Sequence, residues 1–238
     1  MTGAVDFSQR SKQKELLDRD DIPFADIEKN MRELDVINTW LGGHAISIEG
    51  FRRLIGDRRQ VSLCEIGCGG GDNLRVLSRW CERHGITVRV TGIDNNTHCL
   101  AVAKQRWIGD NAVWICSDYR EVAFADGRPD ILFSSLFCHH FTDAELTGQL
   151  RWMEENATVG WFINDLQRHR LAYYSIRLLT AAFSGSYLVR NDAPLSVLRG
   201  FSRAEWDRLL AAAGMDDCRV SWKWAFRWLV TRSKQTYV

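Results

Sequence analysis

The chain has 238 residues, of which 45% are hydrophobic and 26% are charged, and its formal net charge is +1. This length suits one large domain, and the composition is that of a soluble globular protein. A near-neutral chain without a one-sided run of lysine or arginine has no general attraction for nucleic acid, and no stretch approaches the length of a membrane span. The seven cysteines are scattered without a C-x-x-C pair, and the first residues lack the apolar core of a signal peptide. We therefore expect a cytoplasmic protein that binds neither nucleic acid nor membrane.

Two helices are predicted before the first strand. Residues 1–20 are polar and mixed in charge, which indicates a loose, solvated arm. From Asp26 apolar residues recur at helical spacing as far as Gly42-Gly43, a typical helix stop, and a second helix follows and ends at Gly56. Because these helices precede the first strand, we expect residues 1–60 to be an addition to the core that covers a ligand site.

The stretch VSLCEIGCGGGD, residues 61–72, predicts a strand, a glycine turn and the start of a helix. Glycine lets the backbone take positive φ and lets a ligand lie against the main chain, while a helix start supplies unpaired N–H donors. Dinucleotide-binding turns carry glycine at the first, third and sixth positions, but here the sixth is Asp72. Its carboxylate would repel a pyrophosphate, and Glu65 adds negative charge ahead of the turn. The turn therefore favours a ligand with a cationic end.

Glu65, Gly67, Gly69 and Gly71 form the pattern E-x-G-x-G-x-G. This pattern resembles motif I of the class I methyltransferases that bind S-adenosylmethionine. The resemblance implies that the backbone of the glycine turn, with Cys68 between its first two glycines, approaches the methionine part of the cofactor. It also implies that Glu65 supports that end of the site.

The second predicted strand, residues 87–93, ends at Asp94. A carboxylate at this point can accept two hydrogen bonds from the hydroxyls of a ribose. Dehydrogenases also use an acid here, so Asp94 alone does not choose between the cofactors. Asn95, which follows, is a candidate lid on the adenosine.

The third predicted strand, residues 112–116, is followed by Ser117, Asp118 and Tyr119. In the class I methyltransferases an aspartate at this place accepts a hydrogen bond from the adenine amino group, and the next side chain packs against the ring. The resemblance therefore assigns these two roles to Asp118 and Tyr119.

The fourth predicted strand, residues 130–134, continues into Ser135 and the sequence LFCHHF. This segment resembles the one that follows the fourth strand in the same family, where it lies beside the cofactor. Two adjacent histidines on a helical turn point in different directions, so we expect at most one of His139 and His140 to face the substrate. A helix is predicted over residues 143–156.

The segment between the fifth predicted strand, residues 158–163, and Gly200 is longer than a simple connection requires. It combines an amphipathic stretch with a polar loop, SGSYLVRNDAPLSVLRG. We expect it to form a cap, at about residues 166–200, over the carboxyl ends of the strands, where ligands bind in such sheets. The phrases NDLQRHRLAYY and RNDAPLSVLRGF resemble segments of bacterial methyltransferases that act on small aromatic or polyketide-derived molecules. The candidate substrate-binding residues are Trp40, Arg168, Tyr173, Arg190 and Arg199, with Asp192 and Ser196 as further contacts.

The chain closes with a helix that Ser202 and Glu205 begin as a capping box, followed by an antiparallel pair of strands at 218–226 and 227–233. This order predicts an α/β fold with a doubly wound, mostly parallel seven-stranded sheet, amino-terminal helices and a helical cap inserted after strand five. Residues 61–238 would then be the S-adenosylmethionine-binding domain. The histidines and cysteines lack the spacing of a zinc site, so no metal is predicted.

The residues and the resemblance together predict methyl transfer from S-adenosylmethionine to a hydroxyl, or a carbon, of a small, aromatic or polyketide-derived acceptor in secondary metabolism. A phenol with a pKa of about 10 needs a base near neutral pH. The first candidates for the base are His139 and His140, and the next are His169 and Asp165. The alternatives are a nicotinamide-dependent oxidoreductase, disfavoured by Asp72, and a non-catalytic protein that binds S-adenosylmethionine. We expect a monomer or a homodimer.

Overall fold

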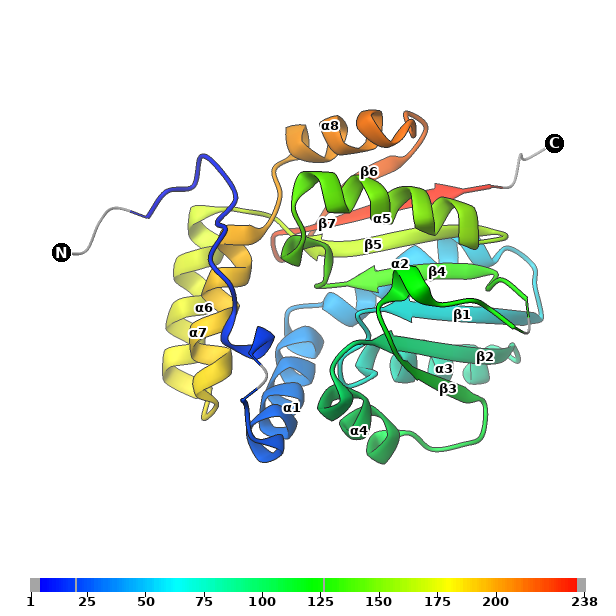
Figure 1. The fold of residues 1–238 in the computed structure, drawn as a ribbon, viewed down its shortest axis with the longest axis horizontal. Coiled ribbons are helices and arrows are strands. Elements are labelled where there is room, and N and C mark those ends of the chain that lie inside the picture. Colours follow the sequence, from blue (N-terminus) through cyan, green and yellow to red (C-terminus); the bar gives the residue numbers. More distant parts are fainter. Residues whose placement is uncertain (1–4, 20, 126, 235–238) are drawn as a thin grey trace.

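The computed structural model describes residues 5–19, 21–125 and 127–234. Its centre is a seven-stranded sheet in the order β3-β2-β1-β4-β5-β7-β6, in which β7 runs antiparallel to both its neighbours and the other pairs are parallel (Figure 1). The predicted doubly wound, mostly parallel α/β sheet is therefore confirmed. The strands are β1 (Gln60–Ile66), β2 (Thr87–Asp94), β3 (Ala112–Cys116), β4 (Ile131–Ser135), β5 (Gly160–Leu166), β6 (Arg219–Lys223) and β7 (Arg227–Ser233).

Helices cover both faces of this sheet and its carboxyl edge. The helix predicted over residues 143–156 is present with those bounds, and the predicted capping box begins α8, where Ser202 Oγ accepts a hydrogen bond from the Glu205 N–H. None of the described helices is long and apolar enough to cross a membrane. The helices are α1 (Phe24–Trp40), α2 (Gly43–Ile55), α3 (Asp72–Arg83), α4 (Thr97–Arg106), α5 (Asp143–Asn156), α6 (Arg170–Phe183), α7 (Tyr187–Arg199) and α8 (Arg203–Ala213), with 3-10 turns η1 (Leu16–Asp18), η2 (Tyr119–Glu121) and η3 (Cys138–His140).

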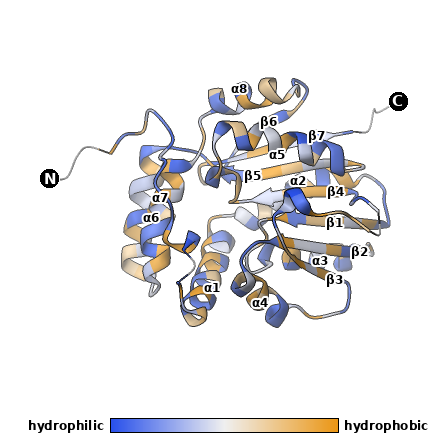
Figure 2. Cartoon of the chain, in the orientation of Figure 1, coloured by the Kyte–Doolittle hydropathy of each residue, from blue (hydrophilic) through white to orange (hydrophobic). Residues whose placement is uncertain are grey.

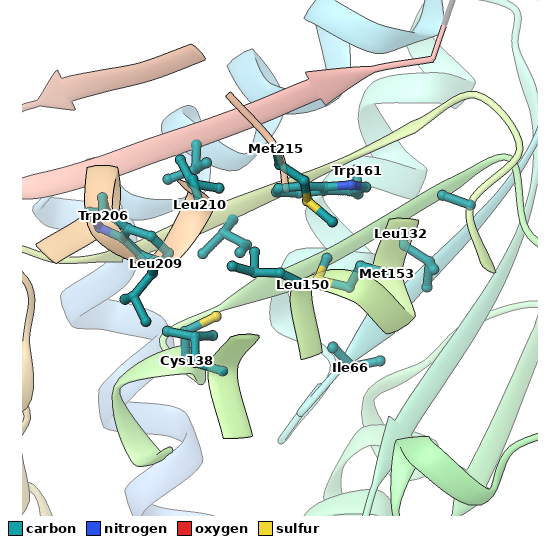
Figure 3. Close-up of a cluster of buried hydrophobic side chains, with 14 of the residues drawn as sticks. Ile66, Leu132, Cys138, Leu150, Met153, Trp161, Trp206, Leu209, Leu210 and Met215 are labelled. Carbon is teal, nitrogen blue, oxygen red and sulfur yellow. The ribbon is translucent and has the colours of Figure 1, made fainter. Parts of the chain in front are cut away.

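Two apolar layers hold the sheet because alternate side chains of a strand point to opposite faces. On one face Cys64 and Ile66 of β1 pack with side chains of α5 and α8, which meet over Trp161 of β5 (Figure 3). On the other face Val61 and Leu63 pack with α2, α3 and α4. Figure 2 shows the apolar run of the central strands and the polar residues on the outer faces of the helices. These layers fix the positions of the strand ends, where the site lies.

The amino-terminal arm differs from the expected loose, solvated segment. Its described part, residues 5–19, runs along α7 and reaches η1 beside α1 (dark blue in Figure 1). The Glu15 side chain is only 6% exposed, and Arg10 donates hydrogen bonds to backbone carbonyls of the loop after β4. The arm is ordered because its polar groups find buried partners, which its polar composition did not predict.

The expected polar loop after α6 is in fact the helix α7. Ser186 caps its start by accepting a hydrogen bond from the Val189 N–H, and apolar residues such as Leu188 and Leu195 are buried. The Pro194 inside the helix and the mixed polarity concealed its period. The helix forms because it packs between α6, the arm and the sheet, so tertiary contacts override the weak local signal.

Candidate functional site

A pocket with a volume of about 680 Å³ lies at the carboxyl ends of the parallel strands. Its wall combines the turn between β1 and α3, the ends of β2 and β4, and parts of α1, η1, η3 and α7. Segments from distant parts of the chain therefore meet here. All the residues predicted to bind the cofactor line this pocket, namely Glu65, Gly67, Cys68, Gly69, Asp94, Asn95, Asp118, Tyr119 and Ser135.

The glycine turn lies against the pocket with no room for side chains at its first position. Gly67 has φ of 65°, and a Cβ atom there would lie 2.2 Å from Cδ2 of Phe137. Gly69 has φ of 50°, and its N–H donates a 2.8 Å hydrogen bond to Asp94 Oδ2. Only glycine takes these conformations at low cost. The turn thus presents bare backbone to a ligand.

Asp94 stands at the end of β2 with both carboxylate oxygens in use. They accept hydrogen bonds from the N–H groups of Gly69 at 2.8 Å and of Asn96 at 2.9 Å. Burial raises the pKa of this carboxyl, while these hydrogen bonds act in the opposite direction. Because a carboxylate has about four acceptor sites, Asp94 can accept further bonds from hydroxyls in the pocket.

Glu65 has an unsatisfied oxygen at the pocket wall. The side chain is 1% exposed; its Oε1 accepts a 3.3 Å hydrogen bond from Asn73 Nδ2, whereas Oε2 has no hydrogen-bond partner within the described part of the chain. Burial, with the charges of Asp72 and Asp94, raises its pKa well above the usual range. A cationic ligand group would both satisfy Oε2 and favour the charged carboxylate. The residues present therefore fit S-adenosylmethionine, whose methionine part carries an ammonium group.

Asp72, in contrast, does not meet a ligand as a free negative charge. Its Oδ1 lies 2.7 Å from Arg106 Nη1 and 3.3 Å from Arg75 Nη2. Burial, with the neighbouring Asp35, raises its pKa to about 6 despite these guanidinium groups. Glu65 is therefore the stronger structural reason for a cationic ligand.

Asp118 and Tyr119 line the pocket just beyond the end of β3, each with partners of its own. The Asp118 carboxylate is hydrogen-bonded to Arg120, which lowers its pKa. The Tyr119 ring is buried against Phe137 and Trp152. An adenine amino group at Asp118 would share the carboxylate with Arg120.

Two imidazoles lie together at the end of the pocket next to the arm. His139 is 2% exposed; its Nδ1 is 2.8 Å from Asp165 Oδ1, and its Nε2 is 3.4 Å from Glu15 Oε1. Burial lowers its pKa, but the charge and hydrogen bond of Asp165 and the charge of Glu15 outweigh burial and raise it to about 9. Nε2 of His140 is 3.7 Å from Glu15 Oε2, and its Nδ1 is 3.4 Å from Asp18 Oδ1.

Both histidines line the pocket, and the expectation that at most one of them faces the substrate stays a prediction. The histidines can share the pocket because they lie on the tight turn η3, where their rings are 4.5 Å apart and tilted by only 33°. The candidate base Asp165 does not line the pocket. It is fully buried behind His139 and orients that imidazole. Asp165 is therefore placed to act through His139.

The arm supplies two acidic pocket residues that the sequence reasoning missed, Glu15 and Asp18. Ser196 Oγ of α7 donates a 2.6 Å hydrogen bond to Glu15 Oε1, and Asp192 accepts the backbone N–H groups of Leu16 and Leu17. The available signal was the apolar pair Leu16-Leu17 within the otherwise polar stretch 8–21. That pair marks where the arm packs down on the molecule.

The remaining candidates lie outside the pocket lining. His169 caps α6 by accepting the Leu171 N–H, and its ring stacks on Phe226. Trp40 is 84% exposed on α1. Tyr173 packs edge to face against the ring of Phe7 in the arm.

The three candidate arginines bind backbone carbonyls. Arg168 donates to the carbonyls of Phe7 and Gly200, and Arg190 donates to that of Ser184. Arg199 holds η3 through hydrogen bonds to the carbonyls of His139 and His140. Arg199 therefore supports the wall of the pocket from behind, whereas the further contacts Asp192 and Ser196 do line it.

Comparisons with known proteins agree with this architecture. Residues 63–160 match a family model described as a methyltransferase domain. A comparison with curated proteins found no match. The plantazolicin methyltransferase BpumL in complex with SAH is similar in structure, with a TM-score of 0.60, 19% identity, and coverage of 83% of this chain and 72% of that one.

Two further structures share the fold. Human N-acetylserotonin methyltransferase in complex with SAM has a TM-score of 0.61, 15% identity, and coverage of 90% of this chain and 57% of that one. A putative O-methyltransferase from Nostoc punctiforme PCC 73102 has a TM-score of 0.58, 12% identity, and coverage of 85% and 59%. At these identities the likeness establishes the fold, and the match over residues 63–160 establishes the methyltransferase domain. Residues 63–160 of this chain are therefore matched to the methyltransferase-domain family, and the chain has the fold of these solved methyltransferases.

Proposed function

We propose that this chain transfers a methyl group to a hydroxyl oxygen of a small, aromatic or polyketide-derived acceptor. The observation that carries the proposal is a single pocket with two different ends. One end has the glycine turn, Glu65 and Asp94, and the other has His139 and His140. The volume of about 680 Å³ lies within the range of about 300–1,000 Å³ typical of small-molecule pockets. It limits the acceptor to a small molecule or to one end of a larger one.

The first end is proposed to hold S-adenosylmethionine. Glu65 Oε2 would accept from the ammonium group, Asp94 from the ribose hydroxyls and Asp118 from the adenine amino group, with Tyr119 beside the ring. When bound, the cofactor supplies a methyl group already activated by a sulfonium. The protein then has mainly to align the acceptor oxygen and to exclude water.

The second end is proposed to receive the acceptor hydroxyl. Both imidazoles line the pocket, and His140 is partly exposed whereas His139 is buried between Asp165 and Glu15. As the methyl carbon bonds to the acceptor oxygen and its bond to sulfur breaks, the hydroxyl proton would pass to an imidazole. We place this proton on His140, since its side chain is 22% exposed on the wall of the pocket, whereas that of His139 is only 2% exposed.

Turnover of labelled S-adenosylmethionine against a panel of phenols, polyketide-derived hydroxyls and peptide amines tests the proposal. We expect phenols to be methylated, and His140→Ala to lower the rate by about 100-fold, as general-base loss does, with S-adenosylhomocysteine still bound. His139→Ala and His140→Ala that both remain fully active would remove the imidazoles from the reaction. Methylation of amines alone would contradict the hydroxyl acceptor.

The non-catalytic alternative makes a different forecast in the same assay. A protein that only binds the cofactor would bind S-adenosylhomocysteine and methylate nothing in the panel. Binding of NADH in place of S-adenosylhomocysteine would instead support an oxidoreductase.

A further inference from the structure

Glu15, His139 and His140 form a compact group of donor atoms on the wall of the pocket. One donor atom from each residue lies within 4.8 Å of the other two. Glu15 comes from the arm and the histidines from η3, so the group exists only when the arm is packed down. No pattern in the sequence brings these residues together, because the arm and η3 lie far apart along the chain.

His139 is oriented as a ligand. Its Nδ1 is 2.8 Å from the fully buried Asp165 carboxylate, which favours Nδ1 as the hydrogen-bond donor and leaves Nε2 as the nitrogen that can bind an ion, with release of any proton it carries. Metal-bound histidines are held in this way by a carboxylate on their other nitrogen. Nε2 is buried and has no hydrogen-bond partner among the residues that the structure describes. An unpartnered buried nitrogen aimed at a carboxylate and a second imidazole indicates that a ligand belongs between them.

The spacing of the donors suits a small cation. Glu15 Oε1 is 3.4 Å from His139 Nε2, and Glu15 Oε2 is 3.7 Å from His140 Nε2. Ligand atoms bound at about 2.0–2.2 Å in a tetrahedron lie roughly 3.3–3.6 Å from one another. The three donor atoms lie within 4.8 Å of one another, so side-chain rotations that shorten the longest separation would bring them onto one ion.

The surrounding charges also favour a cation. Asp18 Oδ1 lies 3.4 Å from Nδ1 of His140, so each imidazole has a carboxylate on the nitrogen that faces away from the group. Together with Glu15, the carboxylates of Asp18 and Asp165 bring the number of carboxylates around the two imidazoles to three. Two nitrogen donors and one carboxylate are the ligand set of a catalytic zinc site that keeps an open position.

We propose that Glu15, His139 and His140 bind one divalent transition-metal ion, such as zinc, with an open position toward the pocket. The ion would tie the arm to η3. A hydroxyl bound at the open position would have a lowered pKa and would release its proton to solvent, whereas in the metal-free chain His140 takes that proton as proposed above. Metal binding itself does not depend on the proposed acceptor.

Metal titration of the full chain tests this inference without any acceptor. Protein stripped with a chelator is titrated with zinc by calorimetry and with cobalt(II) by absorption spectroscopy. We expect one ion per chain and a cobalt spectrum of low coordination number. Glu15→Gln and His140→Asn should each weaken zinc binding by at least about tenfold, as should Asp165→Asn through the orientation of His139. The matched control is His84→Asn, an exposed histidine that contacts Trp80 outside the pocket.

Titration with S-adenosylhomocysteine runs in parallel on every variant. It shows that each variant is folded, and its failure in the metal-free wild type would contradict the cofactor proposal without touching the metal site. Absence of zinc binding in the wild type overturns the inference. Binding that Glu15→Gln and His140→Asn leave unchanged overturns it equally, because the ion would then lie elsewhere.

Discussion

The two ends of the pocket are built in different ways. The cofactor end comes from the edge of the sheet, where β1 leads directly into the glycine turn and the neighbouring β2 brings Asp94 within 2.8 Å of it. The end proposed to receive the acceptor is assembled from the arm, η3 and α7, which lie far apart in the sequence. Strand pairing fixes the first end, whereas the second exists only when the arm is in place.

This difference separates the binding of the cofactor from the entry of the acceptor. The cofactor end has two apolar layers beneath it and can be complete without the arm. The arm is held largely by polar contacts, among them those of Arg10 and Glu15, and the side chains of Leu16 and Leu17 are only partly buried. Segments with few buried apolar contacts open at low free-energy cost. We therefore expect the arm to open and admit the acceptor while the cofactor end keeps its shape.

The largest effect should follow from a side chain in the glycine turn. In Gly67→Ala the new Cβ would meet Phe137 at 2.2 Å in a backbone with φ of 65°. We expect the affinity for S-adenosylhomocysteine to fall by about 100-fold, equivalent to about 2.7 kcal/mol. Calorimetric titration measures this loss.

Gly85→Ala is the matched control for that change. Gly85 also has φ of 65°, but a Cβ there would have no atom within 4 Å. A side chain at this positive φ should lower the free energy of unfolding by about 1–2 kcal/mol. The affinity for S-adenosylhomocysteine should stay unchanged. Equal losses of affinity in both variants would mean that backbone strain, and not the close approach at the pocket, controls binding.

The next effect concerns the charge of Glu65. We expect Glu65→Gln to bind S-adenosylhomocysteine about tenfold more weakly, since an amide replaces the carboxylate that faces the ammonium group. The Glu65 carboxyl has a higher pKa in the folded state than in the unfolded state. As the pH rises above the unfolded pKa of about 4.5, the unfolded state therefore loses this proton before the folded state does, and the stability of the wild type falls. The Glu65→Gln variant has no such carboxyl, so it does not lose this stability as the pH rises. It should therefore melt above the wild type at pH 8 and close to it at pH 4.

Thermal melts of both proteins at the two pH values check the second part of that prediction. A melting difference that stays the same at pH 4 and pH 8 would show that the Glu65 carboxyl does not titrate abnormally. Unchanged affinity would remove Glu65 from the cofactor site.

A smaller effect on binding is expected when the arm is loosened. Arg10 donates hydrogen bonds to the carbonyls of His139, Phe141 and Arg199. In Arg10→Ala we expect trypsin to cleave the arm at Lys12 or Lys14 at least about tenfold faster, with S-adenosylhomocysteine affinity unchanged within about twofold. Arg203→Ala, which removes an exposed ion pair with Asp207, is the control. Equal cleavage rates in all three proteins would contradict the role given to the arm.

The smallest effect is expected at Trp40. Its side chain is 84% exposed on α1 and outside the pocket lining. Trp40→Ala should leave both KM and kcat within about twofold of the wild type, as surface changes usually do. A KM that rises by about tenfold would place the acceptor against α1, beyond the pocket described above.

The same contrast explains what the sequence could predict. The residues at the cofactor end follow directly from strand ends and a glycine turn, patterns set within a few consecutive residues. Glu65, Gly67, Asp94 and Asp118 could therefore be predicted to meet in one pocket, and all four line it. Glu15 reaches His139 only through the packing of the arm on α7, which leaves no local pattern. The charges of Arg168 and Arg199, from which they are predicted as substrate contacts, are visible in the sequence, whereas their backbone carbonyl partners are not.

Titration of the wild-type chain with S-adenosylhomocysteine and, separately, with NADH tests the central claim most directly. The unsatisfied oxygen of Glu65 and the bare backbone of the glycine turn predict saturable one-to-one binding of S-adenosylhomocysteine and no binding of NADH. Binding of NADH, or the absence of S-adenosylhomocysteine binding by the folded chain, would contradict the account.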